Sequence, residues 1–245
     1  MKLLISPTTV DEARLVAEAG CEIVDIKNVD EGSLGAQPPW VIRQIISDIR
    51  SDPRNQSQVS VAIGDLPNKP GTISLAAYGA AQLAPNYIKA GLRDATCLAD
   101  TAAMSHAMVK GIRMVSDAIQ IVISGYADYQ RFGGVSEMDI ITAANDSGAD
   151  VVMLDTLIKD GKSLFDVLSV DAIKAFVDIA HQKGLQVALA GSISMAHIDQ
   201  LKAIGPDIIG LRGAVCHDSD RSQPICSQRV RGLVGYVQSI KQPVG

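Results

Sequence analysis

The sequence predicts an α/β protein that folds as a single (β/α)8 barrel over residues 1–245. Three observations predict this class. Short apolar runs alternate with longer helical patterns from one end of the chain to the other, the runs number eight, and no break in composition divides them. From Ile5 to Gly210 the seven intervals average about 29 residues, which suits a strand, a helix and their connecting loops.

The predicted elements follow the chain in regular alternation. The expected strands are residues 2–6, 22–26, 58–63, 86–90, 118–124, 150–154, 186–190 and 207–210. The expected helices are residues 9–19, 40–49, 71–83, 100–115, 136–145, 169–182 and 194–203, with a final helix near 225–240. Glycine just past a helical pattern is a common stop, and Gly20 and Gly148 stand at such places.

A doubly wound open sheet is the main alternative to a barrel. That fold calls for a glycine-rich dinucleotide-binding turn after the first strand. The sequence has Ser6-Pro7-Thr8-Thr9 at that place, which favours the barrel. Because a barrel builds its active site at the carboxyl ends of its strands, catalytic residues are expected at the eight strand ends.

The composition is that of a globular protein and excludes several classes. Hydrophobic residues make up 47% and charged residues 20%, with a mean hydropathy of +0.17, which argues against disorder. The net charge of −5 and the aromatic content of 4% argue against binding to nucleic acid or to an anionic membrane. No apolar run approaches the ~18 residues that cross a bilayer. The opening MKLLISPTT has too short an apolar run for a signal peptide, so we expect a cytoplasmic protein.

The cysteines and histidines indicate neither a metal site nor a thiol nucleophile. The four cysteines form no CxxC pair, and the four histidines do not lie at metal-ligand spacing. Cys216 directly precedes His217, but adjacent side chains generally point apart, which disfavours a nucleophile pair. We therefore expect reduced, structural thiols and no metal.

Charged side chains gather at the ends of three predicted strands. The second strand ends Val24-Asp25-Ile26-Lys27, and the alternation of a strand places Asp25 and Lys27 on one face. If the aliphatic pair packs against helices, the charged pair points into the barrel mouth. The whole set comprises Asp25, Lys27, Lys89, Asp155 and, four residues into the loop that follows, Lys159.

Two interpretations of this set are open. The charges form either ordinary salt bridges that close the barrel mouth or a reactive site. Burying several charges costs desolvation free energy, and a functional role would explain why the protein retains them. This favours the reactive site. A lysine near other cations has a lowered pKa, so neutral amine becomes available. Such an amine attacks a carbonyl carbon to form a Schiff base, and a neighbouring carboxylate moves the protons.

The ends of the last two strands indicate a phosphate site. Barrels often bind phosphate between the loops after these strands and a helix N-terminus. Backbone amides of Gly191, Ser192, Gly213 and Ala214 are placed to cradle a phosphoryl group, and we expect Arg212 to add charge. Each glycine pair by itself also fits a simple turn, but both at the expected positions favour a phosphorylated substrate.

Two loops are longer than typical connections from strand to helix. They span residues 28–39 and 64–71, and both lie at the catalytic end of the expected barrel. They are either surface insertions or lids that contact substrate, and their position favours the second interpretation. The second loop contains Asp65, whose direction the pattern leaves open.

The sequence resembles the (5-formylfuran-3-yl)methyl phosphate synthases of methanofuran biosynthesis over nearly its whole length. The most specific motif is Asp25-Ile26-Lys27-Asn28 followed by Glu31-Gly32-Ser33-Leu34-Gly35-Ala36. Further matching segments are residues 64–65, 69–72, 87–89, 91–92, 125–128, 153–156, 159–162, 190–192 and 210–216. The stretches 49–58 and 93–117 match least.

The resemblance implies a lyase that joins two glyceraldehyde 3-phosphates, with loss of one phosphate and two waters, to form a furan aldehyde phosphate. The Schiff-base lysine of the family falls on Lys27, and its other active-site lysines and carboxylates fall on Lys89, Lys159, Asp25 and Asp155. The resemblance implies no metal and no organic cofactor. Both a methanogenic and a methylotrophic setting stay open.

Two other functions remain as alternatives to this synthase. One is another class I aldolase or lyase that acts on a sugar phosphate, and the other is a non-catalytic barrel that binds a phosphorylated metabolite. The expected partner is a small phosphorylated aldehyde. The sequence leaves a monomer and a homo-oligomer equally open.

Overall fold

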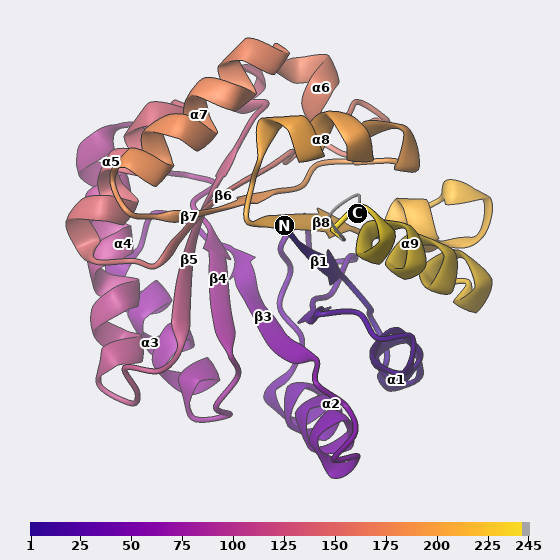
Figure 1. The fold of residues 1–245 in the computed structure, drawn as a ribbon. Helices are drawn as coiled ribbons and strands as arrows, with labels where there is room; N and C mark the ends of the chain where they lie inside the picture. Colours follow the sequence, from indigo (N-terminus) through magenta and orange to yellow (C-terminus); the bar gives the residue numbers. More distant parts are fainter. Residues whose placement is uncertain (242–245) are drawn as a thin grey trace.

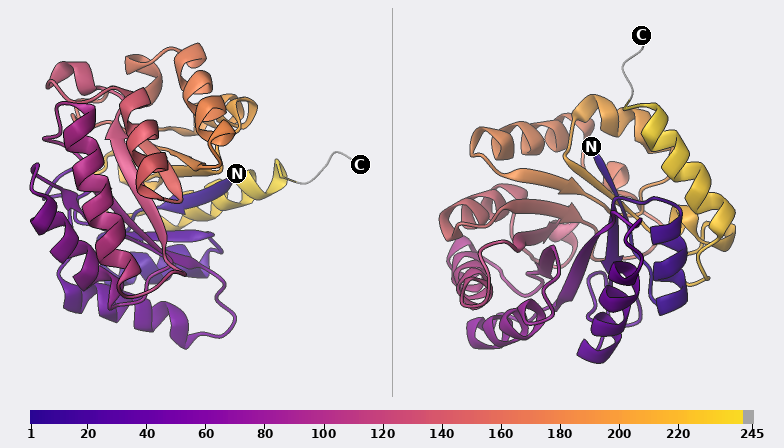
Figure 2. Two further views of the ribbon diagram at one scale, coloured as in Figure 1. Left: turned by 90° about the vertical axis from the view of Figure 1, so that its left-hand side faces the viewer. Right: turned by 60° about the horizontal axis from the view of Figure 1, so that its bottom comes forward.

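Eight parallel strands, hydrogen-bonded in sequence order, form a closed barrel, and β8 pairs back to β1. The computed structural model describes residues 1–241 and shows the helices on the outside of the strands (Figure 1, Figure 2). The predicted (β/α)8 barrel is therefore confirmed. The strands are β1 (Lys2–Ile5), β2 (Ile23–Ile26), β3 (Gln58–Asp65), β4 (Tyr87–Gly91), β5 (Gln120–Tyr126), β6 (Val151–Asp155), β7 (Gln186–Leu189) and β8 (Ile208–Leu211).

The helices lie close to their predicted positions. They are α1 (Val10–Glu18), α2 (Pro39–Ser51), α3 (Pro70–Ala81), α4 (Leu98–Arg113), α5 (Glu137–Ser147), α6 (Leu164–Val167), α7 (Val170–Gln182), α8 (Ile198–Ile204) and α9 (Ser227–Ser239). Short 3₁₀ helices are η1 (Tyr129–Arg131), η2 (Met195–His197), η3 (Gly213–Val215) and η4 (His217–Ser219). Helix α6 was not predicted, and the helix expected over 194–203 is divided into η2 and α8.

Local sequence signals explain where several helices begin and end. The side-chain oxygens of Thr9, Ser136 and Ser169 each accept a hydrogen bond, at 3.1–3.2 Å, from the main-chain N–H three residues later. Gly20 and Gly148, the predicted stops, have φ angles of 80° and 76°. This left-handed conformation is open to glycine at little cost. No helix in the described part of the chain is long and apolar enough to cross a membrane.

The alternation within β2 separates two environments. Val24 and Ile26 pack into the large apolar core between the strands and the helices. Inside the barrel a smaller apolar cluster, which includes Leu4 and Met153, fills the space below the charged residues. Asp25 and Lys27 have the opposite orientation to Val24 and Ile26, so they point into the barrel as the pattern predicted.

Candidate active site

A cavity of about 530 Å³ opens at the carboxyl ends of the strands. Four of the five predicted charged residues line it: Lys27, Lys89, Asp155 and Lys159. The fifth, Asp25, is fully buried next to them and pairs with Lys89. Residues from β2, β4, β6 and the loop after β6 are thus brought together, because the carboxyl ends of parallel strands meet at one rim.

Asp25 and Lys89 form a buried ion pair. Lys89 Nζ lies 2.7 Å from Asp25 Oδ2, and Ser6 Oγ donates a hydrogen bond of 2.7 Å to the same oxygen. Burial alone would raise the pKa of Asp25, but the positive charges of Lys89 and Lys27 outweigh burial and hold it below its ordinary value. Asp25 Oδ1 is buried and has no hydrogen-bond partner among residues 1–241, which leaves an unsatisfied acceptor next to the lysines.

Lys27 differs from the other two lysines in its partners. Its Nζ donates to the main-chain oxygen of Ser33 at 3.2 Å, and its side chain forms no ion pair within 4.0 Å in the described residues. Burial and the nearby charge of Lys89 lower the pKa of Lys27 from 10.5 to about 8, although Asp155 and Asp25 act in the opposite direction. About one tenth of Lys27 is therefore neutral amine at pH 7, far more than for a lysine with the ordinary pKa.

Asp155 and Lys159 form a second ion pair on the far side of the cavity from β2. Lys159 Nζ lies 2.7 Å from Asp155 Oδ1 and 3.1 Å from Thr156 Oγ1, and the main-chain N–H of Thr156 also donates to Oδ1. Burial would raise the pKa of Asp155, but Lys159 and Lys27 hold it well below its ordinary value. The free carboxylate is thus the resting form of Asp155.

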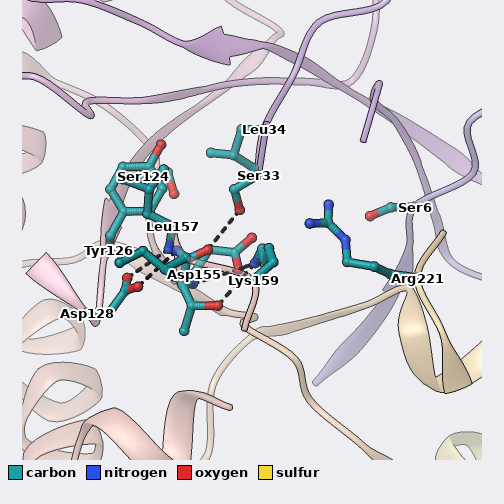
Figure 3. A network of polar contacts seen from close by, with 12 residues as sticks. Ser6, Ser33, Leu34, Ser124, Tyr126, Asp128, Asp155, Leu157, Lys159 and Arg221 are labelled. Carbon is teal, nitrogen blue, oxygen red and sulfur yellow. Dashed lines mark hydrogen bonds and ion pairs between the residues drawn. The ribbon is translucent and has the colours of Figure 1, made fainter. Parts of the chain in front are cut away.

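The loop after β2 contacts Lys27 through Ser33 and is fixed at two points, of which Figure 3 shows the bond made by Ser33 Oγ. Ser33 Oγ donates to the main-chain oxygen of Thr156 at 3.0 Å. The N–H of Leu34 donates to the carboxylate of Asp65, which also accepts a hydrogen bond from the hydroxyl of Tyr126. This settles the direction of Asp65, and it gives the 28–39 loop a role at the site rather than that of a surface insertion.

Gly32 lies within the same loop where no side chain fits. Its φ angle is 138°, and a Cβ there would overlap the carboxylate of Asp65. The close approach brings the main-chain oxygens of Gly32 and Ser33 to the cavity side, where Arg221 and Lys27 contact them. Packing therefore requires glycine at position 32.

A buried carboxylate positions the loop that carries Lys159. Asp128, after β5, accepts hydrogen bonds from the N–H groups of Leu157 and Ile158 at 2.8 and 2.9 Å (Figure 3). The side chain of Arg131, in η1, pairs with Asp160 at 2.6 Å and so ties the loop down a second time. The pattern analysis did not find Asp128, because a lone acidic residue in a loop carries no periodic signal.

The predicted phosphate-binding segments lie in the same cavity. Gly191, Ser192, Gly213 and Ala214 all line it. Gly191 has a φ of 106°, and a Cβ there would lie 3.0 Å from the Thr156 side chain and 3.1 Å from its main-chain nitrogen. The backbone therefore approaches the β6 end closely at this point, and no side chain fits there.

Arg212, expected to add charge at the phosphate site, is engaged mainly within the protein. Although Arg212 lines the cavity, its guanidinium pairs with Glu12 at 3.1 Å and donates to the main-chain oxygens of Ser6, Arg221 and Gln223. Four of its five N–H donors thus have partners in the protein, and the Glu12 carboxylate balances its charge. Arg212 fixes the loop after β8 to the start of α1.

Ser6 and Arg221 were not among the predicted site residues, and Ser33 was named only within the matched segment 31–36. Arg221 lines the cavity from the segment after β8, and its N–H lies 3.5 Å from the Gly32 oxygen. No sequence pattern distinguishes Arg221 from the arginines that follow it, Arg229 and Arg231. Ser6 ends the first predicted strand, and that position was the one signal available for it.

Other reactive groups lie outside this cavity. Within residues 1–241 no group of three or more His, Cys, Asp or Glu side chains is placed to hold a metal ion. Burial raises the pKa of the Cys21 thiol to about 12, which makes it inert.

A closed (β/α)8 barrel with a charged cavity at the carboxyl ends of its strands defines the class of the protein as a barrel enzyme. The model of the 4-HFC-P synthase family matches residues 3–234, and the chain belongs to that family. An Archaeoglobus fulgidus protein named (5-formylfuran-3-yl)methyl phosphate synthase is 46% identical over 97% of this chain and 99% of its own. A Methanosarcina barkeri protein of the same name is 42% identical over 98% of this chain and 100% of its own.

These relatives confirm the resemblance, and because they are named as synthases the alternative of a non-catalytic barrel is not retained. Solved structures are more distant. KGPDC from Streptococcus mutans has a TM-score of 0.65 at 11% identity over 97% of both chains. 3-Hexulose-6-phosphate synthase from Salmonella typhimurium has a TM-score of 0.61 at 15% identity, over 96% of this chain and 99% of that one. At such identities they show the fold alone.

Proposed function

We propose that the protein condenses two molecules of glyceraldehyde 3-phosphate into (5-formylfuran-3-yl)methyl phosphate through a Schiff base on Lys27, in the biosynthesis of a methanofuran-type cofactor. The observation that carries the proposal is the Lys27 amine, which is buried in the cavity with a pKa lowered to about 8. Family membership supplies the product, because curated relatives bear its name.

The atoms of this reaction balance without an oxidant or a reductant. Two triose phosphates lose one phosphoric acid and two waters to give the furan aldehyde phosphate. Lys27 attacks the carbonyl carbon of one triose and expels water to form the imine. Loss of the C2 proton gives the enamine, which expels the C3 phosphate and leaves an electrophilic C3 conjugated to the imine. The central carbon of the second triose, in its enediol form, attacks this C3. Ring closure and loss of two waters then give the aromatic ring as an imine, and hydrolysis returns the amine and releases the aldehyde.

The ion pairs around Lys27 serve these steps in two ways. Asp155 lines the cavity, and its Oδ2 has no hydrogen-bond partner in the described part of the chain, so it is the carboxylate oxygen that reaches the adduct. The unpartnered Oδ1 of Asp25 is the second candidate for proton transfer. Lys89 and Lys159 keep both carboxylates ionised.

Incubation of the purified protein with glyceraldehyde 3-phosphate as its only substrate tests the proposal. We expect absorbance of a furan aldehyde to appear together with one inorganic phosphate for each furan. The two signals are followed in the same reaction, by ultraviolet spectroscopy and by a phosphate assay. An aldol product that retains both phosphates, formed in place of the furan, would instead assign the protein to the other class I aldolases or lyases.

The main-chain amides of Gly191, Ser192, Gly213 and Ala214 are proposed to bind the phosphate of the imine-forming triose. Gly213→Val tests this better than a change at Gly191, because Gly191 has a positive φ that strains any side chain. Loss of hydrogen bonds to a charged group predicts a KM raised by about 10- to 100-fold with a smaller change in kcat. Gly235→Val, in α9 where nothing contacts an added Cβ, is the control. An unchanged KM in Gly213→Val would remove these amides from the site.

A further inference from the structure

The cavity contains one partly buried, permanent positive charge that pairs with no carboxylate in the described residues. Six cationic side chains line it, and three of them pair with carboxylates. The pairs are Lys89 with Asp25, Lys159 with Asp155, and Arg212 with Glu12. Of the other three, Lys27 can release its proton and Arg229 is exposed. Arg221 keeps its charge and has no carboxylate within 4.0 Å among residues 1–241.

Arg221 extends toward the reacting amine. Figure 3 shows its guanidinium in the space between Ser6 and the group of Ser33, Asp155 and Lys159. One N–H lies 3.5 Å from the oxygen of Gly32, and Lys27 Nζ lies 3.2 Å from the oxygen of the next residue, Ser33. Arg221 and Lys27 therefore approach neighbouring carbonyl groups of one loop, so an anion bound by Arg221 lies beside an adduct on Lys27.

The position of Arg221 is fixed by its own segment. Asp218 and Ser219 have φ angles of 54° and 58°, a strained conformation that persists only where the surroundings impose it. The pairing of Cys216 with Ile225 closes the base of the segment. Arg212 Nε donates to the main-chain oxygen of Arg221 at 2.9 Å, so one arginine holds the other in place. The guanidinium is thus presented before any ligand arrives.

The Arg221 guanidinium donates to the loop after β2, whereas the Arg221 backbone lies beside the segment after β8. The Arg221 backbone is next to Gly213, since a Cβ on Gly213 would lie 3.9 Å from the Cβ of Arg221. Its long side chain then carries the guanidinium across the mouth of the cavity to the loop after β2. Two places for an anion result, one at the amides and one at the guanidinium.

We propose that Arg221 forms a second phosphate subsite, which holds the phosphate of the second triose while the first triose is bound to Lys27. The identity of the ligand rests on the proposed function, whereas the existence of a second anion subsite rests on the cavity itself. A condensation of two phosphorylated molecules needs two such places. The guanidinium aligns the second triose beside the Lys27 adduct and offers its planar pair of N–H donors to two phosphate oxygens.

Calorimetric titration with glycerol 3-phosphate tests the second subsite without any reaction, because this probe has no aldehyde to form an imine. We expect two molecules to bind to each wild-type chain and one to Arg221→Gln. The affinity of the lost site should fall by at least about 10-fold, and Arg221→Lys should bind with intermediate affinity because it keeps the charge but not the paired donors. Arg231→Gln, exposed on α9, is the matched control and should bind two.

Steady-state kinetics and borohydride trapping of the same variants give an independent test. In Arg221→Gln the KM for furan formation should rise, while borohydride still traps one triose on Lys27.

Two sites that persist in Arg221→Gln would overturn the proposal, as would a single site in both proteins. A single wild-type site that weakens in Arg221→Gln would place Arg221 with the amides and also overturn it. Thermal unfolding verifies that each variant is folded, and Arg221→Lys replaces Arg221→Gln if the latter is not. Absence of furan would count against the proposed function alone, because the titration does not depend on turnover.

Discussion

Lys27→Arg is expected to abolish furan formation while the protein remains folded. The guanidinium keeps the positive charge next to Asp25 and Asp155, but it does not lose its proton at working pH and cannot attack a carbonyl carbon. Borohydride added during turnover should attach substrate to the wild-type peptide that contains Lys27 and to no peptide of the variant. Mass spectrometry of the digest identifies the site.

Lys202→Arg, which changes an exposed lysine of α8, should behave as wild type. Attachment to Lys89 or Lys159 would reassign the nucleophile. Normal turnover by folded Lys27→Arg would exclude an imine on this residue altogether.

The pH dependence of the wild type follows from the same amine. Because the neutral form is the nucleophile, kcat/KM should rise with pH and level off above the pKa of about 8. The contribution of Lys27 to stability has a matching sign. Its pKa is lower in the folded protein than the 10.5 of the unfolded chain, so its burial costs stability in full below about 8. That cost is relieved as the pH rises from about 8 to 10.5.

Asp155→Asn is expected to lower kcat by ~10²–10⁴ while substrate still binds, because the amide has the shape of the carboxylate but cannot carry the proton. A purely electrostatic role predicts a smaller loss together with a shifted pH optimum. Without the Asp155 charge, which raises the pKa of Lys27, that pKa should fall and the rising limb of the profile should move to lower pH.

The measurement is kcat and KM for glyceraldehyde 3-phosphate across the pH range. Asp117→Asn, at an exposed position, serves as the control. Near-normal kcat at every pH in Asp155→Asn would show that Asp155 has neither role, and Asp25 would become the better candidate for proton transfer.

The charged residues of the site were predictable because they depend on strand geometry alone. A strand alternates between two faces, so the aliphatic Val24 and Ile26 determine where Asp25 and Lys27 point. Parallel strands in a barrel end at one rim, which brings Lys89 and Asp155 to the same cavity without any knowledge of side-chain contacts.

The direction of Arg212 was not predictable in this way. Its guanidinium turns to Glu12, a residue two hundred positions away in the sequence, and that contact exists only once β8 has met β1. Arg221 lies in a segment whose path depends on the same contact, since Arg212 donates to its main-chain oxygen. Loop conformation of this kind follows from tertiary packing rather than from local pattern.

The partner of Lys27 has a consequence for attempts to build this chemistry elsewhere. The acceptor is the main-chain oxygen of Ser33, so no substitution at position 33 removes it and no grafted side chain reproduces it. The environment of the amine is instead encoded by the path of a loop, which Asp65 and Thr156 hold from two other strands. A designer who transplanted the five charged side chains onto another barrel would copy the reactive groups. The buried environment of the Lys27 amine would not be copied with them. We expect a functional transplant to require the 28–39 loop together with its two anchors, the carboxylate of Asp65 and the main-chain oxygen of Thr156.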